Sequence, residues 1–207
     1  GMIKTINDNG DGGVLVGYRD GMIASVNGEM HQVRELWKDI PSMPGMPQGT
    51  FHAMRDSKRN LWVWSPMELL RRDAVTGQWV RGLPDVMRFM GWEGDFPHDV
   101  VMEMAEDNTG LLWLATSRSG LIALDVQHSR VVGHIKNDPA NPRSLAGDNL
   151  QSCYVDDDGQ LWVGTARRGL SRWFPSFFLF ETQEVGDVNG LAFGPDSTLW
   201  IAMQDKG

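Results

Sequence analysis

The sequence has little of several features that would indicate particular classes of protein. Cys153 is the only cysteine among 207 residues, which excludes an internal disulfide framework and a metal site built from several thiolates. No run of about 18 apolar residues occurs, and Gly1 to Lys4 lead into polar residues rather than into an apolar signal segment. We therefore expect no signal peptide or transmembrane helix here, with Gly1 a cloning remnant and any membrane attachment made through segments outside this chain.

Positive charge is also scarce. The 19 Lys and Arg residues are outnumbered by 27 Asp and Glu, which gives a net charge of −8 at pH 7, and no basic run is longer than two residues. A nucleic-acid-binding protein normally carries a basic patch, and a membrane-surface helix carries a basic amphipathic segment. The composition therefore argues against both kinds of partner.

Tryptophan and glycine are abundant, in contrast to tyrosine. The chain has nine Trp and 24 Gly but two Tyr, and 41 % of its residues are hydrophobic, which suffices for a sizeable core. Glycines and aromatic residues that recur at intervals are typical of short strands joined by tight turns.

One pattern recurs five times along the chain. It consists of a short apolar run, an Asp/Asn/Gly turn, Leu-Trp-aliphatic-small, a polar gap and Gly-aliphatic. Its anchors are Leu15, Trp62, Trp113, Trp162 and Trp200, which lie 47, 51, 49 and 38 residues apart. A period of about 40–50 residues matches one propeller blade, and the apolar runs show no helical periodicity. We therefore predict an all-β fold of propeller blades, each with four antiparallel strands.

About four and a half such blades fit the chain. We place them approximately at residues 2–47, 48–97, 98–147 and 148–186, with a partial blade at 187–207. Propeller rings run to about eight blades, so the sequence predicts an incomplete ring. Open strand edges favour association, and we therefore expect this chain to pair with further blades or with a second copy.

The fourth blade illustrates the expected roles of the repeated residues. Strands are expected at 150–155 and 161–165. Gly159 suits the hairpin turn between them, with positive φ, and Trp162 would fill the space between neighbouring blades. Gly164 would leave room for close sheet packing, and Gly169 would allow the bend before the third strand, which leads to a fourth strand expected at 177–181.

Residues 137–173 resemble the two-component regulator propeller repeat. The matching residues are Asp138-Pro139, Asn141-Pro142, Ser144-Leu145, Asn149, Asp158-Gly159, Leu161 to Thr165 and Gly169-Leu170. The resemblance implies the periplasmic sensor domain of a hybrid two-component regulator, with a transmembrane helix and a kinase or cyclase module outside this chain. Many sensors of this kind are thought to detect oligosaccharides, so the resemblance also implies carbohydrate sensing.

The loops between second and third strands offer the candidate ligand-binding residues. In a propeller these loops open at the same end as the loops leading into the inner strands. Arginine side chains that converge there would suit a carboxylate or sulfate group, and Trp64 or Tyr18 could stack on a sugar ring. The alternative interpretation is ordinary exposed turn charge. His98 and Asp99 are candidates for a different reason, because they lie just before an inner strand, where a loop would reach the central opening of the ring. The candidate set is Arg19, Trp64, His98, Asp99, Arg118, Arg167 and Arg168.

The sequence offers little catalytic or metal-binding chemistry. It has no nucleophile elbow, no phosphate-binding loop and no closely spaced pair of His, and the acidic run 156–159 is better explained as a hairpin turn than as a Ca²⁺ loop. We therefore predict a non-catalytic protein without metal or cofactor that senses a small ligand. The competing functions are a protein–protein interaction scaffold and a propeller lyase or glycosidase, which would need paired carboxylates or a His-based metal site.

Overall fold

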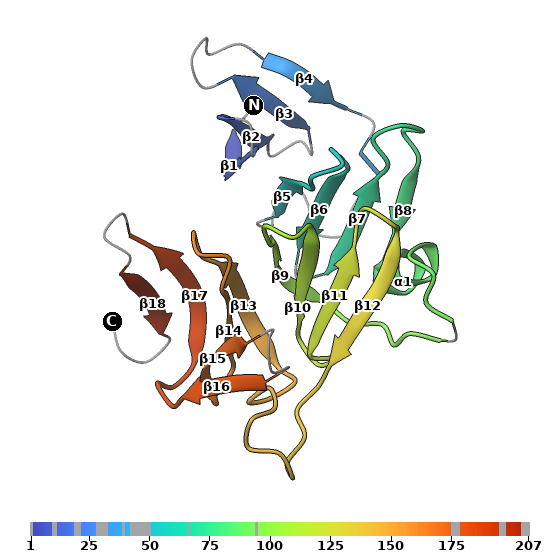
Figure 1. Ribbon diagram of the computed structural model, residues 1–207. Coiled ribbons are helices and arrows are strands. Elements are labelled where there is room, and N and C mark those ends of the chain that lie inside the picture. Colours follow the sequence, from blue (N-terminus) through green and yellow to red (C-terminus); the bar gives the residue numbers. More distant parts are fainter. Residues whose placement is uncertain are drawn as a thin grey trace. The chain divides into compact units, whose positions relative to one another are not determined.

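The computed structural model describes residues 2–9, 12–18, 22–27, 33–38, 40–41, 51–65, 67–93, 95–174, 179–194 and 198–203. The chain divides into two compact units, Gly1–Phe89 and Met90–Gly207. Each sheet within them is a meander in which consecutive strands pair antiparallel (Figure 1). The predicted class, all-β with four-stranded antiparallel blades, is confirmed.

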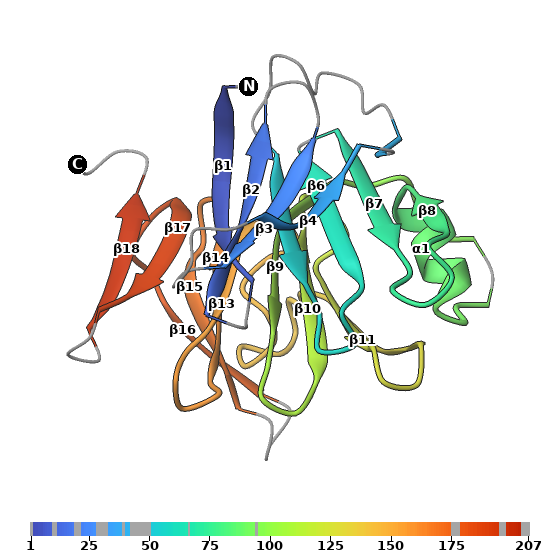
Figure 2. The same ribbon diagram turned by 90° about the horizontal axis from the view of Figure 1, so that it is seen from above.

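The first unit contains two four-stranded sheets and a short helix. Its strands are β1 (Ile3–Asp8), β2 (Gly13–Tyr18), β3 (Ile23–Asn27), β4 (Val33–Trp37), β5 (His52–Arg55), β6 (Leu61–Ser65), β7 (Glu68–Arg72) and β8 (Trp79–Arg81). Apolar side chains from both sheets form one core, in which Leu15 and Ile23 pack with Phe51, Val63 and Leu70. The helix α1 (Leu83–Phe89) follows β8 directly and was not expected from the repeat (Figure 2).

The second unit contains two four-stranded sheets and a two-stranded one. Its strands are β9 (Val101–Glu106), β10 (Leu111–Thr116), β11 (Leu121–Asp125), β12 (Arg130–Ile135), β13 (Leu150–Val155), β14 (Leu161–Thr165), β15 (Gly169–Phe174), β16 (Leu179–Gln183), β17 (Val188–Phe193) and β18 (Leu199–Met203). The innermost strands are neighbours, because β9 contacts β13 and β13 contacts β17. The core between the first two sheets includes Trp113, Leu150, Val163 and Trp173.

In three copies of the repeat, an aspartate before the hairpin turn fixes the tryptophan. The indole Nε1 of Trp62, Trp113 and Trp162 donates to an aspartate Oδ2 six residues earlier, at 2.8 Å in each case; the acceptors are Asp56, Asp107 and Asp156. The other oxygen of each carboxylate accepts the backbone N–H four residues later, so one side chain closes the turn and holds the ring. This double role explains why Asp and Trp recur together.

The fifth copy departs from this arrangement. Gly194 occupies the aspartate position before the turn, where its N–H bonds to the carbonyl of Thr198 at 2.8 Å. Trp200 is 66 % exposed, whereas Trp62 and Trp113 are buried and Trp162 is half-buried. The expectation that each Trp fills the space between blades therefore does not hold for Trp200, whose sheet has two described strands.

Two glycines of the fourth sheet are required by close packing. A Cβ on Gly164 would clash with Ser152 and with Val188 of β17, so this residue lets the neighbouring inner strand approach. Gly169 has φ of +83°, and a Cβ there would also clash with the carbonyl oxygen of Gln183.

Candidate functional site

The second-to-third-strand loops lie beside the segments that enter the inner strands, within the second unit. The amide of Ser117 donates to the carbonyl of Val100 at 3.0 Å, and the amide of Ala166 donates to the carbonyl of Asn149 at 2.9 Å. These bonds join each loop to the start of β9 or β13. The candidate residues on these loops therefore sit at the end of the sheets where the inner strands begin.

Asp99 ties such a loop together. Its carboxylate accepts hydrogen bonds from Ser117 Oγ at 2.6 Å and from the backbone amides of Val100, Arg118 and Ser119 at 2.7, 3.0 and 2.7 Å. Burial alone would raise the pKa of Asp99, but these hydrogen bonds outweigh it and hold the pKa below its ordinary value. The side chain is 1 % exposed, so Asp99 shapes the loop rather than offering a free carboxylate.

Arg118 and His98 surround that aspartate on the outside. The Arg118 guanidinium lies with Nε 3.6 Å from Asp99 Oδ1 and donates through its Nη2 to the carbonyl of His98 at 3.2 Å. Arg118 is 73 % exposed, and His98 is also exposed. These three candidates form one local cluster, in which Arg118 and His98 remain accessible to a ligand.

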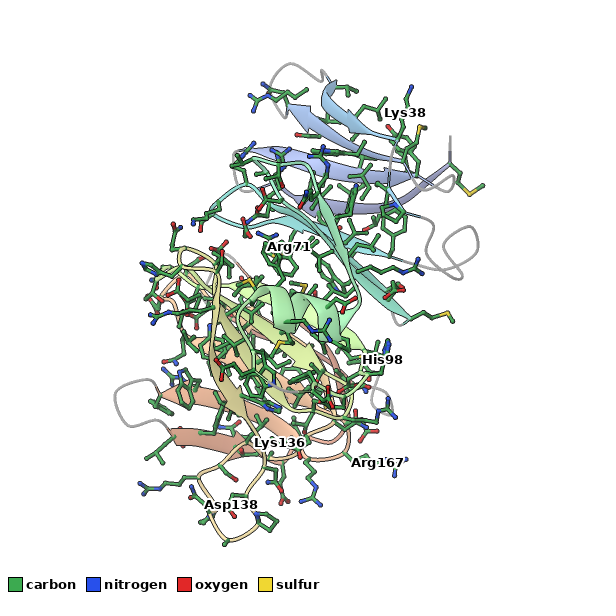
Figure 3. All side chains as sticks on the ribbon, turned by 90° about the vertical axis from the view of Figure 1, so that its right-hand side faces the viewer. Lys38, Arg71, His98, Lys136, Asp138 and Arg167 are labelled. Atoms are coloured by element: carbon green, nitrogen blue, oxygen red, sulfur yellow. The ribbon has the colours of Figure 1, made fainter. Side chains whose placement is uncertain are left out.

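Arg167 and Arg168 lie in a separate groove of about 900 Å³, which we call the arginine groove. Its lining comes from the segments 137–146 and 184–186, and Gly169 and Thr182 complete it; we call the segment 137–146 the long wall. Both arginines are exposed, and Arg167 adopts φ of +74°, which is unusual for a residue with a side chain. Figure 3 shows Arg167 and His98 along the same side of the second unit.

The long wall of the arginine groove is held by its own hydrogen bonds. The amide of Asn137 donates to Asp148 Oδ1 at 2.7 Å, and Asn137 Nδ2 donates to the carbonyl of Leu145 at 2.6 Å. The amide of Asp138 donates to Ser144 Oγ at 2.9 Å. The buried Leu145 joins the core, so the polar rim is anchored to the sheets and is organised before any ligand arrives.

The groove presents groups of both signs. Arg167 and Arg168 supply planar donors, whereas Asp138 and Glu184 supply carboxylates and Asn141 supplies an amide. Carboxylates accept from hydroxyl groups, and guanidinium groups donate to hydroxyl, carboxylate or sulfate oxygens. This arrangement suits a hydroxyl-rich ligand that carries acidic groups.

The other candidates do not join the groove. Trp64 is 2 % exposed on β6 and stacks on His52 with ring centroids 5.3 Å apart, so its faces are not open to a sugar ring. Arg19 lies outside the described residues. Sequence reasoning missed the wall residues Asn137, Asp138 and Glu184. The Asp138-Pro139 and Asn141-Pro142 pairs were a usable signal for the loop that holds the first two, because such pairs mark turns and loops.

Neither a metal-binding cluster nor a membrane-spanning helix occurs in the part of the chain that the structure describes. Among those residues no group of three His, Cys, Asp or Glu could hold a metal ion. Over the same ranges, no helix has the length and apolar character needed to cross a membrane.

Comparison with known proteins supports the repeat and the fold. Residues 144–167 match the family model described as two component regulator propeller, which confirms the predicted resemblance for that segment. No curated protein matches the chain.

Solved structures show the same architecture at low identity. The extracellular domain of the putative hybrid two component system BT3049 from B. thetaiotaomicron is 17 % identical, with a TM-score of 0.63 over 98 % of this chain and 26 % of that chain. The extracellular domain of BT4673 from the same organism is 16 % identical, with a TM-score of 0.50 over 97 % of this chain and 33 % of that one.

A third similar structure is described as a β-propeller domain. The β-propeller domain of Myceliophteria_thermophila Cps50 (Swd1) is 13 % identical, with a TM-score of 0.62 over 99 % of this chain and 64 % of that chain. At such identities the likenesses establish the β-propeller fold alone. The chain spans about a quarter to a third of the two B. thetaiotaomicron domains.

Proposed function

We propose that this chain is a non-catalytic, ligand-sensing part of the periplasmic propeller of a bacterial two-component sensor. Its ligand is an acidic oligosaccharide, which binds in the arginine groove. The observation that carries the proposal is the convergence of Arg167 and Arg168 with the polar segment 137–146 in one open groove of about 900 Å³. Transmembrane signalling would belong to segments outside this chain.

Three features support a saccharide rather than a flat protein partner. The groove is concave, its rim combines guanidinium, carboxylate and amide groups, and its long wall is prearranged by hydrogen bonds. Sites with a few convergent polar groups in a cavity of this size are typical of small-ligand binding. The match of residues 144–167 to a sensor repeat and the likeness to extracellular domains of hybrid two-component systems point in the same direction.

The position of the carboxyl group with a raised pKa, Glu103, fits ligand binding rather than proton transfer in the arginine groove. Burial raises the pKa of Glu103 to about 7, as a general acid would require, but Glu103 is not part of the lining of the arginine groove. The groove therefore offers recognition chemistry, and we propose no bond-breaking step.

Calorimetric titration with acidic and neutral oligosaccharides tests the proposal. Uronic-acid hexasaccharides should bind, neutral hexasaccharides should bind at least about tenfold more weakly, and Arg168→Ala should remove most of that preference, because one charge-assisted bond contributes about 1.5–3 kcal/mol. Arg167→Gly should act similarly while keeping the positive φ. Arg88→Ala, an exposed arginine of the first unit, is the control. Unchanged acidic binding in both groove variants would refute the proposal.

Self-association is a second proposal. The exposed Trp200 on the two-stranded sheet β17–β18 supports it, because a large exposed aromatic on a sheet favours contact with another chain. Sedimentation velocity over a range of concentrations, with Trp200→Ser for comparison, should show an oligomer that the variant loses. A monomer at all concentrations would contradict this proposal.

A further inference from the structure

A second cavity of the second unit lies at the outer side of the packing between its two four-stranded sheets. It has a volume of about 870 Å³ and is lined from β10, β11 and β12, from the turns 107–109 and 158–159, and from β14, β15 and β16. The segment 138–145 lines this cavity as well as the arginine groove. We call it the interblade cavity.

Three aromatic rings contribute to the apolar lining of the interblade cavity. Trp113 and Trp173 lie with ring centroids 6.2 Å apart and planes tilted by 58°, and Trp173 and Phe180 lie 4.8 Å apart at 46°. The indole N–H of Trp113 is already bonded to Asp107, so the ring offers carbon surface to the cavity. Val132 of β12, which is 45 % exposed, adds aliphatic surface to the same lining.

Small residues on the sheet that also carries Trp113 leave the space unfilled. Gly133 of β12 pairs with Ala123 of β11, and both line the cavity. A Cβ on Gly133 would meet the Ala123 Cβ at 3.4 Å and the Ile135 side chain at 3.9 Å, which is ordinary contact, and Gly133 has no positive φ. Neither the backbone conformation nor a close neighbour therefore requires glycine at this position. The absence of a side chain leaves empty space on this face of the sheet.

Two exposed cations stand at the rim of the interblade cavity. Lys136 follows β12 directly, and the backbone of Arg143 is fixed because its carbonyl accepts the amide of Phe180 at 2.8 Å. Figure 3 shows Lys136 near the start of the loop that carries Asp138.

Two acidic side chains of the same lining, Asp107 and Asp138, already accept hydrogen bonds, so they are less available to pair with Lys136 and Arg143. Asp107 accepts four hydrogen bonds within its own turn, and Asp138 Oδ1 accepts the amide of Ala140 at 3.0 Å. Asp158 lies in the turn after β13, at the opposite end of the sheets from Lys136 and at the end where β16 begins, so it is closer to Arg143 than to Lys136.

We propose that the interblade cavity binds an organic anion with an aromatic or branched apolar body. The body packs on Trp113, Trp173 and Phe180, and the carboxylate or sulfonate group faces Lys136 and Arg143. Cavities of roughly 300–1,000 Å³ with a mainly apolar lining and a few polar groups are typical small-molecule sites. This ligand differs in chemistry from an oligosaccharide and uses other side chains, so the inference goes beyond the function proposed above.

Two fluorescent probes that share an apolar body test the inference on the full chain. 8-Anilinonaphthalene-1-sulfonate carries an anionic group, and N-phenyl-1-naphthylamine is its neutral counterpart. Both should bind the wild type at one site. The double variant Lys136→Ala/Arg143→Ala should weaken the sulfonate probe by roughly tenfold and leave the neutral probe unchanged, because exposed ion pairs make modest contributions. Lys58→Ala/Arg88→Ala, two exposed cations of the first unit, is the charge-matched control.

A cavity-filling variant provides the second test. Gly133→Leu projects a side chain into the cavity and should abolish binding of both probes, while near-ultraviolet circular dichroism stays like that of the wild type. Unchanged probe affinity in a folded Gly133→Leu variant would overturn the inference. An equal loss of affinity for the sulfonate probe in Lys136→Ala/Arg143→Ala and in Lys58→Ala/Arg88→Ala would also overturn the inference. This comparison remains decisive even if Gly133→Leu fails to fold.

Discussion

Glu103 should make the stability of this protein fall as the pH rises through neutrality. It lies on β9, paired across the strands with Ala115, and one of its carboxylate oxygens accepts the backbone N–H of Met104 at 3.1 Å. Burial raises its pKa from 4.5 to about 7, although the Met104 N–H opposes the shift. Cys153 of β13 is close enough that the Glu103 charge, in addition to burial, raises the thiol pKa well above its usual range.

The sign and size of the effect follow from this pKa. Glu103 is protonated in both the folded and the unfolded chain below about pH 4.5. Between about pH 4.5 and 7 the unfolded chain releases the proton while the folded chain keeps it, so the free energy of unfolding falls by about 1.4 kcal/mol per pH unit. The total loss is on the order of 3 kcal/mol and levels off above the folded pKa.

Urea unfolding at a series of pH values, with Glu103→Gln as the reference, measures this effect. Glutamine keeps the shape but does not titrate, so the variant should be about as stable as the wild type near pH 4.5 and more stable by on the order of 3 kcal/mol near pH 8. Other groups that titrate in this range cancel in the difference. A difference that stays constant from pH 4.5 to 8 would refute the assignment of a buried, neutral carboxyl to Glu103.

Three further perturbations test other parts of the structure. Asp107→Asn should lower the free energy of unfolding by about 1–3 kcal/mol, and a double-mutant cycle with Trp113→Phe should show coupling; additive effects would contradict the side-chain bond. Gly169→Ala should lower the free energy of unfolding by at least about 1–3 kcal/mol, measured by thermal unfolding, because alanine would be strained at this positive φ and close to the Gln183 carbonyl; a variant as stable as the wild type would disprove that strain. Asp99→Ala should speed amide exchange in the loop 117–119 while that of β13 stays slow; equal protection to the wild type would show that Asp99 does not hold the loop.

Much of the fold was predictable from the repeat because its signals are local. The Asp-Gly turns and Leu-Trp runs placed strands at 150–155 and 161–165, where β13 and β14 lie. The outer strand expected at 177–181 is β16, Leu179–Gln183, and its position was harder to fix because outer strands lack the tryptophan motif. The helix α1 has no counterpart in the strand periodicity of the repeat and was therefore not predicted, although Pro84 and Asp85 near its start are typical helix-start residues.

The site was less predictable because it depends on tertiary contacts. The sequence indicated that Arg167 and Arg168 lie at the end where the inner strands begin, and the structure places them there. The sequence did not show that the Asp99 carboxylate accepts hydrogen bonds from the amides of a loop about 20 residues away, or that Trp64 is buried against His52. Both outcomes depend on neighbours that no local motif encodes.

The most direct test of the central claim is a nuclear magnetic resonance titration of the chain with a uronic-acid hexasaccharide. We predict saturable shifts of the Arg167 and Arg168 guanidinium Nε–H signals and of the Asn141 amide, with little change in β18. Saturable binding that leaves all three signals unchanged would contradict the assignment of the arginine groove as the ligand site.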